Sequence, residues 1–339
     1  MKITIGDVAK KAGVSKATVS RVLNGQYQHV TEETKQRVLA VIQELDYRPN
    51  ALARGLKQNR TNLIGIILSN LRNPFWSSVL EGVEDACRNA GYNLVICNSN
   101  EEAFLEEEHI KGLQTRQVDG IIVNPTVKNK PLFESLIKSH YPLVLINRRI
   151  DNLKVDMVVM DNIYGARLAI EHLLSVGRKK IAILLYPLEG VSPRQERLEG
   201  YKQALSGHGL PIDEKLIKIV PEYKGSCKEA VIDWIKNGVC PDAIFSTNNV
   251  MTLEVLEGIQ EAGLCVPDDI AVIGYDETVW SKHLNPPLTT IQQPAYQMGE
   301  LAAQRLIKLI EAKRKPRPKV QVLAPNIIIR QSCGAKKEK

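Results

Sequence analysis

The stretch IGDVAKKAGVSKATVSRVLNG at residues 5–25 predicts two short helices joined by a tight turn. Gly13 lies between two apolar helical patterns and can adopt the left-handed conformation that an alanine would resist. Ser15 can cap the second helix, Gly25 follows its end, and Thr31 can open a third helix. We therefore expect a small three-helix core formed by Val8, Ala9, Ala12, Val19, Val22, Leu23, Val38, Leu39, Val41, Ile42 and Leu45.

Positive charge is concentrated in this first part of the chain. Residues 1–60 carry 11 Lys or Arg and 5 Asp or Glu, which leaves a net charge of only +1 for the rest out of a total of +7. The outward positions of the second helix, Lys16, Ala17, Ser20 and Arg21, can bond phosphates and base edges. A small basic unit favours a polyanion as partner, although charge alone is also compatible with a well-solvated surface.

The motif DVAxxAGVSxxTVSRVLN at residues 7–24 resembles the signature of the lactose-repressor (LacI/GalR) family of bacterial transcription regulators. The resemblance implies a helix-turn-helix whose second helix lies in the major groove of DNA. Carried over by position, it implies base contacts from Lys16, Ala17 and Arg21, and the arginine fork suits guanine O6 and N7. The phosphate contacts that it implies come from Ser15, Thr18 and Ser20.

Residues 49–57, PNALARGLK, form a short segment between two parts of different composition. Pro49 disfavours helix in the residue before it, and Asn50 can cap a new helical turn. So short a helix is not stable alone, and we expect it to fold only with DNA and a second copy of itself. The resemblance implies paired hinge helices in the minor groove, with Ala53 at their close approach and Leu56 as a wedge between bases. Without the resemblance, the alternative is a plain linker turn.

From residue 62 onward, apolar strands alternate with helical segments. This alternation predicts an α/β core of doubly wound parallel sheets, and the number of strands predicts two lobes. The expected strands are residues 63–68, 93–97, 120–123, 143–146, 157–160, 180–185, 216–220, 243–245, 270–273 and 289–291. The resemblance implies lobes of periplasmic-binding-protein type, between which the chain crosses near Asp161, Ile291 and Leu323. The expected domains are a helix-turn-helix headpiece at 1–47, a hinge helix and linker at 48–61, an N-terminal lobe at 62–161 with 292–322, a C-terminal lobe at 162–291 with 323–333, and a tail at 334–339.

Residues just after each strand are candidates for a binding site, because ligands of doubly wound sheets bind outside the carboxyl ends of the strands. Aromatic side chains occur there beside amides, carboxylates and guanidinium groups, a lining that suits a polyhydroxylated ligand. The alternative is that these positions are polar only because they lie in loops. The candidate effector-binding residues are Asn70, Phe75, Asn147, Arg148, Arg194, Arg197, Tyr223, Asn248 and Asp276.

The family resemblance implies effector contacts from Arg197, Asp276 and Asn248, and a stacking aromatic at Tyr223. Asn249 departs from the family pattern, in which an aspartate stands at this position.

Four arginines, Arg148, Arg149, Arg194 and Arg197, are expected near one cleft and favour an anionic effector such as a sugar acid, for example a ketodeoxygluconate-like molecule. A neutral sugar is the alternative, because the family keeps an arginine at the position of Arg197 for neutral sugars too.

Several classes of function lack support in the sequence. It contains no motif for phosphoryl transfer, zinc hydrolysis or serine hydrolysis, and its six histidines are dispersed, so we expect no enzyme activity, cofactor or metal. Without a signal segment, a run of 18 apolar residues or a CxxC pair, a cytoplasmic protein with free thiols and no membrane contact is expected. The segment KRKPRPK at 313–319 could bind a second polyanion, but after a long predicted helix a solvated turn is expected.

Together these features predict a sequence-specific DNA-binding repressor of carbohydrate or sugar-acid catabolism genes that a small-molecule effector releases from its operator. One headpiece contacts only half a site, so a homodimer on a pseudo-palindromic double-stranded operator is expected. No heptad repeat for a tetramer follows Arg330. The alternatives are a co-repressor-dependent regulator of the same family and a cytoplasmic small-molecule binding protein without DNA function.

Overall fold

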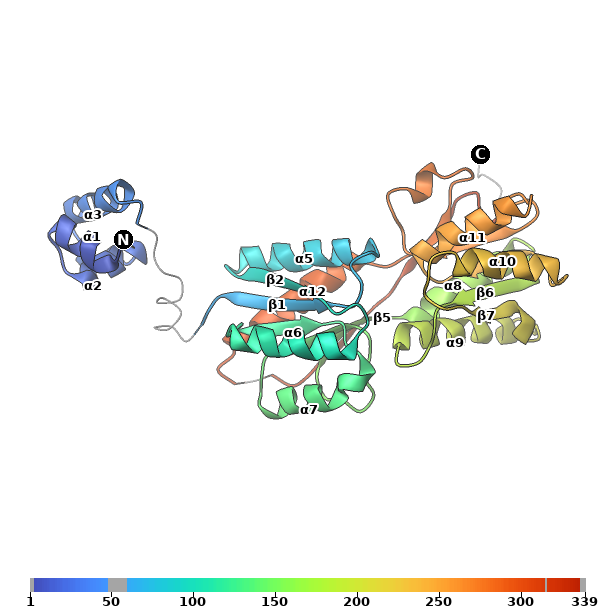
Figure 1. Cartoon of the computed structure of the whole chain (residues 1–339), viewed down its shortest axis with the longest axis horizontal. Coiled ribbons are helices and arrows are strands. Elements are labelled where there is room, and N and C mark those ends of the chain that lie inside the picture. The colour runs from blue at the N-terminus through green and yellow to red at the C-terminus, as the bar shows by residue number, and fades with distance from the viewer. Residues whose placement is uncertain (1–2, 48–59, 315, 336–339) are drawn as a thin grey trace. The chain divides into compact units, whose positions relative to one another are not determined.

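The computed structural model of the chain describes residues 3–47, 60–314 and 316–335 (Figure 1). It divides into two compact units, residues 1–61 and residues 62–339. The described part of the first unit is all-helical, and the second unit is an α/β core with two sheets. The predicted hinge helix, with Asn50, Ala53 and Leu56, lies outside the described residues.

Within the described residues, the first unit begins each of its α-helices with a side-chain cap. Its elements are α1 (Ile5–Ala12), α2 (Lys16–Leu23), η1 (Tyr27–His29) and α3 (Glu32–Glu44). Thr4 forms a capping box with Asp7, while Ser15 and Thr31 accept backbone amides at the starts of α2 and α3. Gly13 has a φ of 65°, so the turn between α1 and α2 uses the left-handed conformation that glycine adopts without strain.

The three helices enclose a small apolar core. It consists of Val8, Ala9, Ala12, Val19, Val22, Val38 and Val41, with Leu23, Ile42 and Leu45 packed against it. The prediction that Leu39 is buried is wrong, because 38% of its surface is exposed. Val38, Val41, Ile42 and Leu45 recur at spacings of three and four and share one face of α3, whereas Leu39 lies about 100° around the helix from Val38.

Each half of the core contains a six-stranded sheet. The first sheet has the order β11-β5-β4-β3-β1-β2, and all of its strands are parallel. Its strands are β1 (Leu63–Leu68), β2 (Asn93–Asn98), β3 (Gly120–Val123), β4 (Leu143–Asn147), β5 (Asp156–Met160) and β11 (Val320–Leu323). The second sheet has the order β12-β10-β9-β8-β6-β7. Its strands are β6 (Ile181–Leu185), β7 (Ile217–Ile219), β8 (Ala243–Ser246), β9 (Ala271–Tyr275), β10 (Thr289–Gln292) and β12 (Asn326–Ile328).

Helices cover both faces of each sheet (Figure 1). The first sheet is covered by α5 (Phe75–Asn89) with α12 (Ala295–Glu311) and by α6 (Ala103–Thr115) with η2 (Val127–Asn129) and α7 (Lys130–Lys138). The second is covered by α8 (Asn162–Ser175) with α9 (Ser192–Gly207) and by α10 (Ser226–Lys236) with α11 (Asn249–Glu261), beside η3 (Glu214–Leu216) and η4 (Ser281–His283). The backbones of α5 and α12 touch, since a Cβ on Gly82 would lie 2.1 Å from the carbonyl oxygen of Tyr296.

The chain passes between the two sheets three times, after β5, after β10 and after β11. The sequence does not predict β11 and β12, because both are short edge strands with partly exposed side chains and no continuous apolar run. β12 pairs antiparallel with β10, which departs from the predicted parallel arrangement. An antiparallel edge strand is common on an otherwise parallel sheet.

Candidate functional sites

The outward face of α2 presents unpaired cations. Lys16, Ala17 and Arg21 are exposed, and neither Lys16 nor Arg21 forms an ion pair with any residue that the structure describes. Val19 and Val22, on the opposite face, are buried in the headpiece core and hold the helix in place. The predicted base-reading residues therefore share one accessible face.

The three hydroxyl residues of α2 and its cap are already oriented by local hydrogen bonds. The Ser15 hydroxyl accepts the Thr18 amide at 3.1 Å and lies 3.0 Å from the Thr18 hydroxyl. Asn24 donates to the Ser20 hydroxyl at 3.4 Å. Each hydroxyl oxygen retains bonding capacity, so these contacts are compatible with the predicted phosphate contacts.

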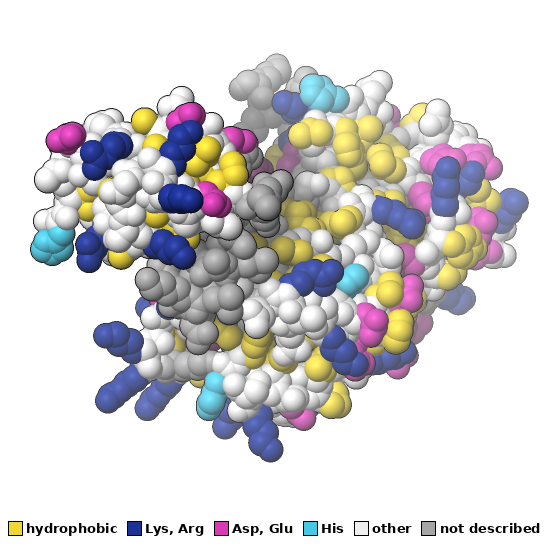
Figure 2. All heavy atoms as spheres, turned by 60° about the vertical axis from the view of Figure 1, so that its left-hand side comes forward, with side chains coloured by type: hydrophobic (Ala, Val, Ile, Leu, Met, Phe, Trp, Pro, Cys, Tyr) yellow, Lys and Arg dark blue, Asp and Glu magenta, His cyan; other side chains and the backbone are white. Residues whose placement is uncertain are grey.

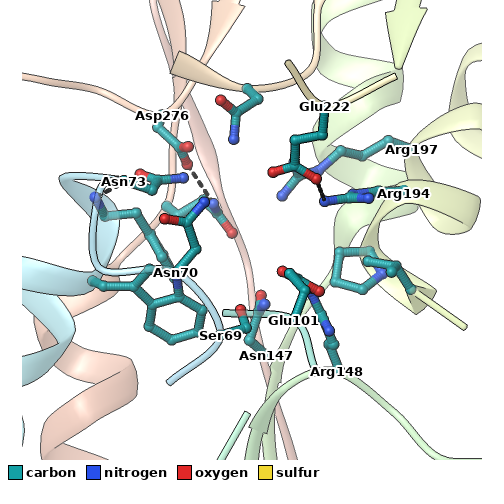
Figure 3. Close-up of a pocket in the computed structure, with 16 residues that line it drawn as sticks. Ser69, Asn70, Asn73, Glu101, Asn147, Arg148, Arg194, Arg197, Glu222 and Asp276 are labelled. Carbon is teal, nitrogen blue, oxygen red and sulfur yellow. Dashed lines mark hydrogen bonds and ion pairs between the residues drawn. The ribbon is translucent and has the colours of Figure 1, made fainter. Parts of the chain in front are cut away.

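A polar cleft lies between the two lobes of the core (Figure 3). Eight of the nine predicted effector residues line it, and Tyr223 does not. The lining residues are Ser69, Asn70, Asn73, Phe75, Trp76, Glu101, Asn147, Arg148, Val191, Pro193, Arg194, Arg197, Glu222, Asn248, Asp276 and Gln293. They follow strands of both sheets, as expected when the carboxyl ends of parallel strands meet at one edge.

On the first lobe, Arg148 is held by a carboxylate. Its side chain is only 5% exposed, and Nη2 donates to both oxygens of Glu101 at 2.5 and 2.6 Å. Its Nε is buried without a hydrogen-bond partner. Glu101 is a non-glycine residue with a φ of 65°, a conformation that costs L-residues energy. The ion pair between Arg148 and Glu101 is therefore short, but the Nε–H of Arg148 has no hydrogen-bond acceptor.

On the second lobe, Arg194 and Arg197 have different environments. Arg194 lies at the rim of the cleft, where it binds Glu222 at 3.0 Å and the carbonyl oxygen of Pro187. Arg197 is buried, donates to Asn162 at 3.1 Å and to the Thr247 carbonyl at 2.6 Å, and stacks 3.6 Å from the centre of the Tyr275 ring. These contacts fix the guanidinium of Arg197 in one orientation.

Asp276 is a buried carboxylic acid in the lining of the cleft. Burial raises the pKa of this carboxyl group, and the opposing effect of the nearby Arg197 is smaller. Gln293 donates to one oxygen of Asp276, while Asn249 donates to the other at 3.3 Å. The same Asn249 amide donates to Asn73 of the first lobe at 2.7 Å, so it links the two lobes.

This double donation shows what Asn249 contributes at the position where the family pattern has an aspartate. An ionised carboxylate at this position has no hydrogen to donate to Asn73 or to Asp276. The asparagine instead supplies the hydrogens that both acceptors need.

Several cleft residues are absent from the sequence-based prediction. Glu101, Glu222 and Gln293 follow strands β2, β7 and β10, so their position after a strand was a usable signal. Tyr223 is 53% exposed and donates to Glu229, which places it outside the cleft lining. Arg149 binds Glu196 at 3.0 Å and does not line the cleft either.

Comparisons with known proteins agree with this architecture. A family model described as bacterial regulatory proteins, lacI family, matches residues 4–50, and one described as a periplasmic binding protein-like domain matches residues 170–333. The probable HTH-type transcriptional regulator EndR of Paenibacillus polymyxa is 35% identical over 322 residues, which cover 93% of this chain and 93% of that protein. The chain belongs to the LacI family.

Two further LacI-family proteins match nearly the whole chain. The HTH-type transcriptional regulator KdgR of Bacillus subtilis is 34% identical over 332 residues, or 97% of each protein. The crystal structure of the lac repressor dimer bound to operator and the anti-inducer ONPF has a TM-score of 0.87 and 29% identity, and the match covers 99% of this chain and 100% of that chain. As a LacI-family protein, the chain is a DNA-binding transcriptional regulator with a helix-turn-helix headpiece and an α/β core of two lobes.

Within residues 3–47, 60–314 and 316–335, no helix is both long enough and apolar enough to cross a membrane. The same residues contain no group of three or more His, Cys, Asp or Glu side chains that could hold a metal ion.

Proposed function

We propose that the chain is a repressor that binds a pseudo-palindromic operator and releases it when a small polyhydroxylated effector enters the cleft between the lobes. The observation that carries this proposal is the ring of polar side chains around the cleft, which comes from both lobes and is bridged by the hydrogen bond from Asn249 to Asn73. A ligand bound there contacts both lobes at once, so it can favour one relative arrangement of the lobes over another.

The base readers in this proposal are Lys16, Ala17 and Arg21, with Ser15, Thr18 and Ser20 on phosphates. The effector contacts are Asn70, Phe75, Asn147, Arg148, Arg194, Arg197, Asn248 and Asp276. The domain boundaries predicted from the sequence complete the proposal, with the headpiece at 1–47, the hinge and linker at 48–61, and two discontinuous lobes.

A homodimer in the bacterial cytoplasm is the proposed state of the protein, acting by binding without catalysis. Val250 and Leu253 on α11 are 41% and 44% exposed, and Val279 in the loop that follows β9 is 86% exposed. Exposed apolar side chains on neighbouring segments are typical of a subunit interface. A two-fold dimer would present two headpieces to the two halves of an operator.

For the chemical class of the effector, we propose a sugar acid. The Nε of Arg148 lacks a partner, and the residue that neutralises Arg148 is the strained Glu101, so a ligand carboxylate can take the place of Glu101.

A neutral sugar is the second candidate, because the cleft already balances its charges. Arg148, Arg194 and Arg197 face Glu101, Glu222 and Asp276.

The test begins with a search for ligand and operator. A thermal-shift screen of hexuronates, ketosugar acids, neutral hexoses and purines identifies compounds that bind the folded core. Operator duplexes are selected from a random library with the full-length chain, and their affinity is measured with and without the compound. We expect a hexuronate-type compound to bind and to weaken operator affinity. Operator affinity that is unchanged at saturating ligand would refute the proposed mechanism, and a ligand that tightens binding would indicate a co-repressor.

A further inference from the structure

One edge of the first sheet carries cations that neither the headpiece nor the cleft uses. The segment KRKPRPK at 313–319 contains five Lys or Arg and no acid, whereas the core outside it is net negative. Four of these cations lie in the described part of the chain, and all four are exposed. We define the basic edge as these four residues and the exposed Lys154, that is, Lys154, Lys313, Arg314, Arg317 and Lys319.

The cations of the basic edge have no ion-pair partner in the part of the chain that the structure describes. Among the described residues, none of the five side chains forms an ion pair, although sixteen other ion pairs occur in that part of the chain. Arg317 and Lys154 line one groove with His140, Pro316 and Pro318. The one carboxylate in that lining is Asp156, which binds Arg305 at 2.6 Å. The groove is therefore cationic.

The backbone at Arg317 and Lys319 is held in place by a buried ion pair. Asp156, which is 4% exposed, accepts from Arg305 at 2.6 Å and from the backbone amide of Lys319 at 2.8 Å. Arg305 also donates to the carbonyl oxygen of Arg317 at 2.8 Å. Pro316 and Pro318 restrict the backbone further. Because the backbone at these two residues is already fixed, a partner that binds their side chains loses little additional backbone entropy.

The basic edge lies at the end of the lobe from which the chain leads to the headpiece. All strands of the first sheet are parallel, so the segment before β11 and the segment before β1 reach the same edge of the sheet (Figure 1). Asp119 fixes the start of β1 by accepting the amide of Asn62 at 2.8 Å. β11 and β1 are four strand spacings apart, a distance of about 19 Å.

Figure 2 brings the left-hand side of Figure 1 forward and shows several Lys and Arg side chains projecting at its lower left. Any DNA that the headpiece holds is tethered to this edge through residues 48–61, which span at most about 50 Å when fully extended. Phosphates of the bound duplex are thereby kept at high local concentration near the basic edge.

We propose that the basic edge binds phosphates of the DNA that the headpieces hold, as a sequence-independent contact made by the core itself. The proposal rests on the DNA binding of the LacI family and goes beyond the contacts of the headpiece and hinge. Phosphates fit because the cations are clustered and have no ion-pair partner among the described residues, and because Lys and Arg contacts to phosphates position a protein without reading bases.

The test uses a full-length variant with Lys313→Gln, Arg314→Gln, Arg317→Gln and Lys319→Gln. Its affinity for a fluorescein-labelled duplex of mixed sequence is measured by anisotropy between about 50 and 200 mM salt. For each phosphate that the variant no longer neutralises, the slope of log K against log salt should become shallower by about 0.9, and affinity at low salt should fall about tenfold or more. The ratio of operator to mixed-sequence affinity should stay unchanged, because the basic edge reads no bases.

A matched control removes the same charge from the second lobe. It carries Lys179→Gln, Lys180→Gln, Lys236→Gln and Lys282→Gln, all at exposed lysines without ion pairs among the described residues. We expect the salt slope of this control to stay close to that of the unaltered protein. Both variants should melt at the same temperature as the unaltered protein.

The proposal would be overturned if the salt slope of the basic-edge variant were unchanged. It would also be overturned if the control lost as much slope and affinity as the basic-edge variant. Sedimentation gives a second readout: if the basic-edge variant loses its dimer, the surface binds a second copy of the chain and the proposal is wrong. Arg21→Ala in the same assay distinguishes these outcomes from a failure of headpiece binding, because it should lower the ratio of operator to mixed-sequence affinity while the basic edge stays intact.

Discussion

The arginines of the headpiece and those of the cleft differ in what they already bind. Arg21 on α2 is exposed and has no ion-pair partner among the described residues. In the cleft, Arg148 and Arg194 are each held by a glutamate, and Arg197 is fixed by hydrogen bonds and an aromatic ring. An unpaired cation can bind any phosphate or base edge that approaches it. A paired cation binds only a ligand that replaces its partner. The cations of the basic edge resemble Arg21 in this respect, because they too are exposed and have no ion-pair partner among the described residues.

The largest effect is expected at the most constrained cleft arginine. Arg197→Ala removes two hydrogen bonds and leaves buried Asp276 without its nearby cation, so the core should lose about 3 kcal/mol of unfolding free energy as well as ligand binding. Urea unfolding of the full chain measures this loss. Arg194→Ala is the control, and its partly exposed ion pair should contribute less than about 1 kcal/mol. Equal stability losses in the two variants would remove the distinction between them.

The headpiece arginine should affect DNA binding without affecting stability. Arg21→Ala should weaken operator binding by about 1–3 kcal/mol, because it removes a fork that can bond one guanine twice. Arg37→Ala is a matched control on α3, where the arginine lies 3.8 Å from Glu33. Anisotropy titrations against the selected operator should show a loss in the first variant alone, together with relaxed preference at one base pair. Normal operator affinity in Arg21→Ala would contradict its role as a base reader.

The pairing within the cleft can be tested directly at Glu101. Glu101→Gln frees Arg148, so affinity for a hexuronate should rise by about 1 kcal/mol, roughly fivefold, while affinity for a neutral hexose should not rise. Isothermal titration with both ligands provides the measurement. Glu222→Gln is the comparison on the other lobe, and it shows which arginine receives the ligand carboxylate. If neither substitution favours the hexuronate, a neutral sugar becomes the better assignment.

The smallest effect is expected at Asp276 and depends on pH. Because burial raises the pKa of Asp276 in the folded state, its contribution to stability is greatest below the ordinary aspartate pKa of about 3.9 and is lost as pH rises through the folded pKa. Asp276→Asn should therefore raise the melting temperature of the ligand-free core by an amount on the order of 1–3 °C at neutral pH and by less in acid, while weakening ligand binding. Gln293 can rotate its amide to accept from the new asparagine, because its Oε1 is unpartnered. A variant that melts below the unaltered protein at neutral pH would contradict this explanation.

Sequence patterns predicted the regular parts of the fold well, for physical reasons that can be named. β1 has the predicted bounds because a buried parallel strand is a continuous apolar run. β11 and β12 are absent from the prediction because their position in the sheet depends on strands far away in sequence. Leu39 was predicted to be buried from hydrophobicity alone, although the rotation of α3 turns it toward solvent.

By itself, the sequence determined what adjacent residues decide: the capped helices of the headpiece, the cations along α2, and the polar positions after each strand. Only the tertiary structure decided which distant charges meet. It paired Arg148 with Glu101, linked Asn249 to Asn73 across the lobes, and placed Lys319, just before β11, at the end of the sheet where β1 begins. The physical reason is that local patterns follow from neighbouring residues, whereas the partner of a charge depends on how the sheets bring remote segments together.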